Sequence, residues 1–301
     1  MDTATETNEA DMNPDSEYGK TSRPPAYRVE RMRREDGRVA EHFLNGLAGG
    51  SDAFASAMDD PGFAEIIANE LRTERIADEP LDPLARHAPT DRVRRSFERW
   101  LAFIDGDLQP WTTGGAIHFR PHWARVLMLS LVMADLEDLA EEDARALAMA
   151  AAFHDSRRKD PYLDTGHGAR AAAYYARFCR DTRAGAQRNT PAGARIVFDP
   201  RTYLAVKWHD RDDDAGLEAI AEAIRCNALP ELGIDDLASL TPPHARADAA
   251  ALYRMFKDAD GLDRVRLGPQ GLDERFLRTV RGKALVPFAR KLLDASENAG
   301  V

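Results

Sequence analysis

Histidine and aspartate residues that could bind a metal are concentrated in one stretch of this chain. Five of its eight histidines lie between positions 118 and 209, namely His118, His122, His154, His167 and His209. His118 and His122 are four residues apart, so a helix running through both would place them on one face. His154 is followed directly by Asp155, after an apolar run typical of a buried helix end. Imidazole and carboxylate donors together favour zinc, manganese, iron or nickel, and a more oxygen-rich shell favours magnesium. The sequence therefore predicts a divalent metal site and leaves the metal open.

Three acids near the C-terminal end could complete such a metal shell. The segment 255–266 reads MFKDADGLDRVR and contains Asp258, Asp260 and Asp263 on an expected helix. Helical periodicity places Asp260 and Asp263 on the face of Phe256 and turns Asp258 away from it. Spacing alone keeps both Asp260 and Asp263 open as ligands.

Basic residues follow the His-Asp pair directly, although the whole chain carries a formal charge of −10. A phosphate ester bound at a metal needs further positive charge, and a guanidinium group can pair with two phosphate oxygens at once. If the substrate is a phosphate ester, Arg157 and Arg158 are the residues expected to bind its phosphate, with Arg125 as a further candidate. The structural alternative is that these residues are ordinary charges at helix ends.

The segments that must position these residues have a helical pattern. Apolar residues recur at steps of three and four, and strand-like alternation is almost absent, so we expect an all-α fold. The expected helices cover residues 63–76, 93–104, 121–139, 141–153, 168–180, 201–208 and 244–266. Residues 1–26 contain few apolar side chains and are expected to form a disordered tail. Residues 27–110 are expected to be a helical leader region of unknown role, and residues 111–295 the domain that holds the site.

Composition excludes several classes of protein. An acidic surface disfavours non-specific binding of nucleic acid. The sequence has no apolar run of about 18 residues and no secretory signal, so we expect no membrane partner and a cytoplasmic protein. The polar N-terminal segment leaves export as a secreted effector open as an alternative. With only Cys179 and Cys226 present, we expect no disulfide partner and no thiolate zinc site.

The ordered set of residues resembles the HD-domain metal-dependent phosphohydrolase superfamily, in which a first His, a His-Asp pair and a distant Asp follow one another. Here that order is met by His122, His154, Asp155 and Asp260, because the last ligand of the superfamily lies in a run such as ADxL. The segments IHFRPHWARV, AFHDSRRKD, DTGHGARAA and KWHDRDD resemble more narrowly a bacterial subgroup of small HD proteins. The resemblance covers about residues 115–267, and Phe119 stands where the subgroup usually has Gly.

The resemblance implies an HD-like helical bundle with phosphohydrolase activity. The expected reaction is hydrolysis of a phosphoester by a metal-activated water, as in a phosphodiesterase or nucleotidase. The substrate would be a small phosphorylated or nucleotide compound, or a phosphoester attached to a macromolecule. The implied metal ligands are His122, His154, Asp155 and Asp260, and the implied catalytic residues are His118, Asp155 and His167. His118 would act as general acid or phosphate contact, and His167 and His209 remain open as ligands of a second ion.

Three alternative functions stay open beside hydrolysis by a metal-activated water. Some HD proteins are di-iron oxygenases, and the six ligands they need are present as His122, His154, Asp155, His167, His209 and Asp260. The run HFRPHWARV is also distantly similar to phosphodiesterase domains that act on ribosylated protein, although the intact His-Asp pair argues against that mechanism. The third alternative is a non-catalytic domain that binds a ligand at a vestigial site.

Overall fold

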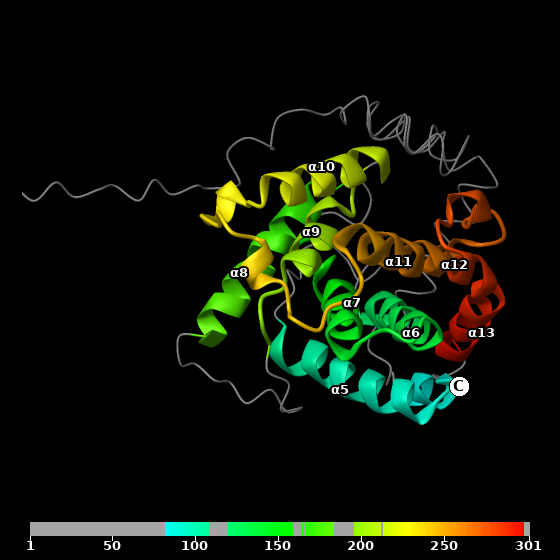
Figure 1. The fold of residues 1–301 in the computed structure, drawn as a ribbon. Helices are drawn as coiled ribbons and strands as arrows, with labels where there is room; N and C mark the ends of the chain where they lie inside the picture. The colour runs from blue at the N-terminus through cyan, green and yellow to red at the C-terminus, as the bar shows by residue number, and fades with distance from the viewer. Residues whose placement is uncertain are drawn as a thin grey trace, which may run out of the picture.

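Helices make up the regular structure of the chain wherever it is described. The structure is a computed structural model that describes residues 82–108, 120–158, 164, 166–183, 196–211 and 213–297. Within these ranges there is no strand or sheet, and one isolated antiparallel bridge joins Leu229 to Ile234. The expected all-α class is confirmed (Figure 1).

Four helices pack around one another at the centre of the described residues. They are α6 (Arg120–Leu136), α7 (Glu141–Phe153), α9 (Pro200–Trp208) and α11 (Ala249–Leu262). Helix α6 contacts α7, α7 contacts α9, α9 contacts α11, and α11 returns to α6 (Figure 1). Segments far apart in the sequence are thus brought together, and each of these helices carries or precedes a residue expected in the metal site.

The remaining helices surround this centre. They are α5 (Asp91–Asp107), α8 (His167–Arg183), α10 (Asp213–Cys226), α12 (Val280–Ala284) and α13 (Val286–Glu297). Short 3-10 helices cover η1 (Asp82–His87), η4 (Pro230–Leu232), η5 (Ala238–Leu240), η6 (Asp263–Leu267) and η7 (Glu274–Phe276). Helix α8 packs on α9, α10 packs on α11, and α13 packs on α6 and η6.

Side-chain caps fix several helix starts. Asp199 accepts a hydrogen bond from the backbone of Arg201 and starts α9, whose first residue is a proline. Asp248 likewise caps α11, which is why this helix begins at Ala249 and not at position 244 as expected. Helix α7 has the expected bounds of 141–153, with three acids in its first turn. The expected helix at 63–76 lies outside the described residues, and α10, α12 and α13 were not among the expected helices.

Helix α5 belongs to the same hydrophobic core as the central helices. Phe97 and Phe103 are fully buried in that core together with Phe153 at the end of α7. The ring of Phe103 lies 6.1 Å from that of Phe153 and 5.8 Å from that of Phe178, measured between centroids. A boundary near residue 110 therefore does not separate two cores among the described residues. The expected tail, residues 1–26, lies outside them.

Two further expectations concern membranes and cysteines. Among the described helices, none is both long enough and apolar enough to cross a membrane. Cys179 is buried and Cys226 is exposed, and both are free thiols.

Candidate metal centre

The central helices bring four imidazoles to one place in the bundle. His122 lies in the first turn of α6, and His167 is the first residue of α8. His154 and His209 are the residues that end α7 and α9. All four rings are buried, with side chains between 1% and 4% exposed. The site is therefore assembled where helix ends meet within the packed centre.

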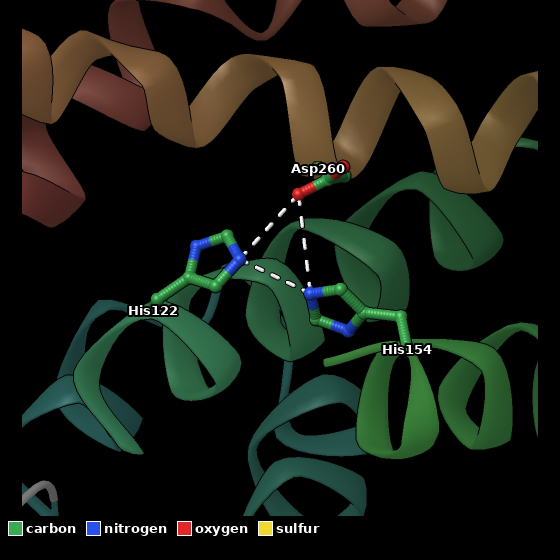
Figure 2. Close-up of side chains that lie close together, drawn as sticks. All are labelled: His122, His154 and Asp260. Carbon is green, nitrogen blue, oxygen red and sulfur yellow. Dashed lines mark hydrogen bonds and ion pairs between the residues drawn. The ribbon is translucent and has the colours of Figure 1, made fainter. Parts of the chain in front are cut away.

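His122, His154 and Asp260 form the first group of ligand atoms. The Nε2 atoms of His122 and His154 are 3.0 Å apart, and Oδ1 of Asp260 lies 3.4 and 3.9 Å from them. Figure 2 shows the two rings and the carboxylate pointing toward one another. This arrangement could hold a metal ion with three protein ligands.

Asp155, His167 and His209 form the second group. The Nε2 atoms of His167 and His209 are 2.9 Å apart. Oδ1 of Asp155 lies 3.2 Å from Nε2 of His167 and 3.6 Å from Nε2 of His209. This arrangement could hold a second metal ion. The two histidines that the sequence left open as ligands of a second ion thus lie together.

Asp155 faces both groups at once. Its Oδ1 belongs to the second group, whereas its Oδ2 lies 3.6 Å from Nε2 of His122 and 3.6 Å from Nε2 of His154. A carboxylate in this position can give one oxygen to each of two neighbouring ions. The two groups are therefore halves of one centre joined by Asp155.

Hydrogen bonds on the far side of each ring fix the histidine tautomers. Nδ1 of His154, His167 and His209 lies 2.8, 2.6 and 2.7 Å from a backbone carbonyl oxygen three residues earlier in the chain. A carbonyl oxygen only accepts, so Nδ1 carries the hydrogen in each ring. In His122, Nδ1 lies 2.7 Å from Oδ2 of Asp263 and donates to it. Every Nε2 therefore presents a lone pair to the centre.

The close approach of these lone pairs makes the centre a candidate for binding a cation. Two unprotonated Nε2 atoms about 3 Å apart repel each other unless a proton or a metal ion lies between them. Burial lowers the pKa of His154 to about 4, with partial opposition from the charges of Asp155 and Asp260. Burial and the neighbouring charge of Arg158 also lower the pKa of His167. Protonation of His154 and His167 is therefore disfavoured near neutral pH. The nitrogen and oxygen donors of the centre are types that bind divalent metals.

The structure distinguishes between the two acids that spacing left open. Asp260 faces the two imidazoles of the first group, and its side chain is 29% exposed. Burial alone would raise the pKa of Asp260, but the facing imidazoles lower it to about 2. Asp263 lies behind His122, where the charge of Arg125 and the hydrogen bond from His122 outweigh burial and hold its pKa well below the ordinary value. Asp260 therefore faces the ligand atoms of the first group, whereas Asp263 lies behind His122 and accepts its Nδ1 hydrogen.

Asp258 is turned away from the site, in agreement with the helical periodicity. It is fully buried, and its carboxylate accepts hydrogen bonds from the backbone nitrogens of Arg278 and Thr279 at 2.8 and 2.7 Å. Asp258 therefore anchors the start of α12 to α11.

The structure separates the three arginines expected at a substrate phosphate. Nη1 of Arg158 lies 3.0 Å from Nε2 of His167 and 3.3 Å from Oδ1 of Asp155, at the second group. The guanidinium of Arg157 stacks on the ring of Tyr174, 3.3 Å from its centroid. Arg158 thus contacts two of the proposed metal ligands directly.

The expected phosphate contact of Arg125 is corrected by the structure. Arg125 is fully buried, and its Nε and Nη2 lie 2.5 and 3.1 Å from the carboxylate of Asp263. Its Nη1 donates to the hydroxyl of Ser296 on α13. A guanidinium enclosed in this way supports Asp263 and cannot also reach a phosphate.

Other residues near the site were not identified from the sequence or lie outside the described ranges. Lys257 is buried, and its Nζ donates to the carbonyl of His209 at 2.7 Å, which holds the end of α9. Its position three residues before Asp260 carries no signal of this role. Trp123, next to His122, is buried, whereas Trp208, next to His209, is half-buried, with the cations of Lys207 and Arg211 over its ring. His118 and Phe119 lie outside the described residues.

Comparisons with known proteins add no relative. No protein-family model matches the chain, and neither the curated proteins nor the solved structures contain a match.

Proposed function

We propose that this protein is a metal-dependent phosphoester hydrolase with two neighbouring divalent ions. The observation that carries the proposal is the pair of facing imidazoles in each group, with Asp155 between the groups. His122, His154 and Asp260 would hold one ion, and His167 and His209 the other, with one oxygen of Asp155 given to each. The resemblance of the motifs to HD phosphohydrolases supports the same assignment.

The chemistry that fits such a centre is attack of water on phosphorus. Two adjacent divalent ions polarise phosphate oxygens and lower the pKa of water, which makes hydrolysis feasible at neutral pH. The chain's own residues fix the geometry, because each Nδ1 hydrogen bond holds its ring in one orientation. Arg158 supplies additional positive charge beside the second group for the phosphate. His118, two residues before α6, is proposed to give a proton to the leaving group.

Access to the centre is proposed from the side of Asp260. The five other proposed ligands have side chains no more than 4% exposed, whereas that of Asp260 is 29% exposed. A small phosphorylated or nucleotide substrate would therefore approach along α11. Substrates attached to a macromolecule, including a ribosylated protein, would have to present the phosphoester at the same opening.

Metal content and hydrolysis, measured together, test the proposal. The purified protein should contain two divalent ions per chain, and a chelator should abolish hydrolysis of an aryl phosphodiester such as bis(p-nitrophenyl) phosphate. Readdition of manganese, zinc, iron, nickel or magnesium should restore it for at least one metal. A folded protein that binds none of these ions would contradict the proposal.

A second candidate function is supported by the same six side chains. All six ligands of a di-iron oxygenase lie within the two groups. Two irons per chain, oxygen uptake with an organic substrate, and no hydrolysis of any phosphoester would favour this candidate.

A further inference from the structure

Arg158 occupies the place that a second ion would take. Its Nη1 lies 3.0 Å from Nε2 of His167 and 3.3 Å from Oδ1 of Asp155. These are two of the three ligand atoms of the second group. The cation of the side chain thus lies among the donors that would hold a metal.

Arg158 and a metal ion cannot both bind His167. Nδ1 of His167 carries the hydrogen that is donated to the carbonyl of Asp164 at 2.6 Å, so Nε2 has a single lone pair to offer. That lone pair accepts a hydrogen bond from Arg158 or binds a metal, but not both. Guanidinium is always charged at physiological pH and would also repel a divalent ion a few ångströms away.

The first group differs in this respect. Its three side chains are His122, His154 and Asp260, and the described contacts show no arginine on their ligand atoms. Arg125 reaches this group only from behind, through Asp263. Among the described contacts, the two groups are therefore unequal before any ion binds, because the guanidinium of Arg158 lies on ligand atoms of the second.

We propose that Arg158 is a tethered competitor for the second metal ion, holding Asp155 and His167 when that ion is absent and leaving them when it binds. The side chain of Arg158 is 12% exposed, and it follows the turn after α7, so it can rotate away from the group. After displacement, its guanidinium remains tethered near the second group, where it can pair with a phosphate group of the substrate. Binding of the second ion and preparation of the phosphate site are thereby coupled. This inference rests on the proposed two-ion function.

Metal affinity of Arg158 variants tests the competition without any measurement of activity. Isothermal titration of the chelated protein with manganese should resolve two sites in the wild type, the second weaker than the first. Arg158→Ala should tighten the second site by about tenfold or more, because it removes a competing cation in direct contact with the ligands. The first site should change by less than about twofold. Arg158→Lys, which keeps the charge but not the planar fork, should lie between the two.

A charge-matched control separates competition from a change in overall charge. Arg177 is an exposed residue on α8, the helix of His167, and its described ring contact is to Tyr174 at 5.8 Å. Arg177→Ala removes the same charge and should leave both affinities at their wild-type values. Equal tightening in Arg158→Ala and Arg177→Ala would overturn the proposal, as would an unchanged or weaker second site in Arg158→Ala.

Thermal unfolding provides a second readout, in case Arg158→Ala folds poorly. Arg158→Gln keeps hydrogen-bonding groups and removes the charge. Manganese should raise the melting temperature of Arg158→Gln by more than it raises that of the wild type, because no competitor must be displaced. An equal rise in both proteins would overturn the proposal.

Inorganic phosphate probes the second half of the proposal. With both ions bound, Arg158→Ala should bind phosphate about tenfold more weakly than the wild type, and Arg177→Ala should not. Unchanged phosphate binding would remove the phosphate role and leave the competition. If no divalent ion binds to the wild type or to any variant, the proposed function itself fails. If two ions bind but Arg158 variants do not alter the second site, only the present inference fails.

Discussion

His122 donates its Nδ1 hydrogen to Oδ2 of Asp263 at 2.7 Å, on the opposite side of the ring from the proposed metal ligand atom. The other three imidazoles of the site donate to backbone carbonyls instead. A carboxylate partner makes an imidazole a stronger donor to a metal and fixes its orientation. Because Asp263 is held by Arg125, and Arg125 by Ser296, this contact also connects the ligand to α13.

Removal of the charge of Asp263 should weaken the first metal site. In Asp263→Asn, His122 keeps a hydrogen-bond acceptor but loses the carboxylate, so the affinity for the first ion should fall about 10- to 100-fold. The buried Arg125 would also lose its counter-charge, at a cost of about 3 to 5 kcal/mol in the free energy of unfolding. Metal titration and urea unfolding measure the two effects.

Asp258→Asn is the matched control for this prediction. Asp258 is as deeply buried as Asp263 and lies five residues earlier in the chain, but its carboxylate binds the backbone of Arg278 and Thr279. The substitution should cost about 1 to 3 kcal/mol of stability and leave metal affinity unchanged. An equal loss of metal affinity in both variants would show that Asp263 acts only through general stability.

The stability of the metal-free protein should fall between pH 6.5 and pH 4. Burial lowers the pKa of His154 from its ordinary value of 6.5 to about 4. Between these two values the unfolded chain binds a proton that the folded chain does not, so the free energy of unfolding decreases as the pH falls. The contribution of His154 is on the order of 3 kcal/mol and is fully present above pH 6.5. Urea unfolding in the presence of a chelator, at several pH values, measures it.

His154→Asn tests whether His154 causes this dependence. The variant lacks the titrating ring, so its stability should change less steeply between pH 6.5 and pH 4 than that of the wild type. His167, whose pKa is also lowered, leaves part of the dependence in place. A curve as steep as that of the wild type would assign the effect to other groups.

Helices with strong local signals could be predicted from the sequence, and those defined by packing could not. The acids that open α7 and the polar residues after Phe153 mark both ends, and the expected bounds agree with the structure. Helices α12 and α13 contain Gly282 and Pro287, which interrupt the pattern. Gly282 lies so close to the side chain of Asp258 that a Cβ atom at this position would clash with it. This contact joins two segments that are distant in the sequence, so a local pattern cannot reveal it.

The candidate site was predictable by residue type but not by arrangement. The order of histidines and acids identified the side chains that lie together. Asp260 and Asp263 are three residues apart, so only the packing of α11 and η6 against α6 decides that Asp260 faces the Nε2 atoms of His122 and His154, while Asp263 lies at Nδ1 of His122. Burial of Arg125 and the position of Asp155 between both groups likewise result from the packing of helices far apart in sequence.

His118 should act in catalysis and not as a metal ligand. It lies four residues before His122, and the sequence predicts a general acid or a phosphate contact at this position. His118→Ala should lower turnover of an aryl phosphodiester by about 10² to 10⁴ and keep the wild-type metal content. His122→Ala should lose metal from the first group and with it thermal stability. Metal content by elemental analysis, measured together with activity, tests this prediction. A His118→Ala protein that keeps its metal and its activity would show that His118 is neither a general acid nor a phosphate contact.

A methyl group at Gly168 should disturb the second metal group through the backbone. Gly168 is the second residue of α8, and a Cβ there would lie 2.8 and 2.9 Å from the carbonyl oxygens of Val206 and Lys207 and 2.9 Å from Nδ1 of His209. Backbone atoms cannot move aside as a flexible side chain can, so Gly168→Ala should cost about 1 to 3 kcal/mol in stability. The same substitution would push the start of α8 away from the end of α9, and these two ends carry His167 and His209 of the second group. The affinity for the second ion should therefore fall, and the affinity for the first ion should not.

Gly261 offers a control with the opposite expectation. It directly follows Asp260 on α11, but a Cβ there would meet only Leu277, at 3.9 Å, which is an ordinary contact. Alanine is more favourable than glycine within a helix by up to about 1 kcal/mol. Gly261→Ala should therefore keep or raise the stability of the protein and leave both metal affinities unchanged. Comparison of Gly168→Ala with Gly261→Ala distinguishes the effect of a steric clash from the effect of replacing a glycine next to a proposed ligand. Urea unfolding and metal titration of both variants measure the difference. An unchanged affinity for the second ion in Gly168→Ala would mean that the close approach of α8 to α9 does not position His209.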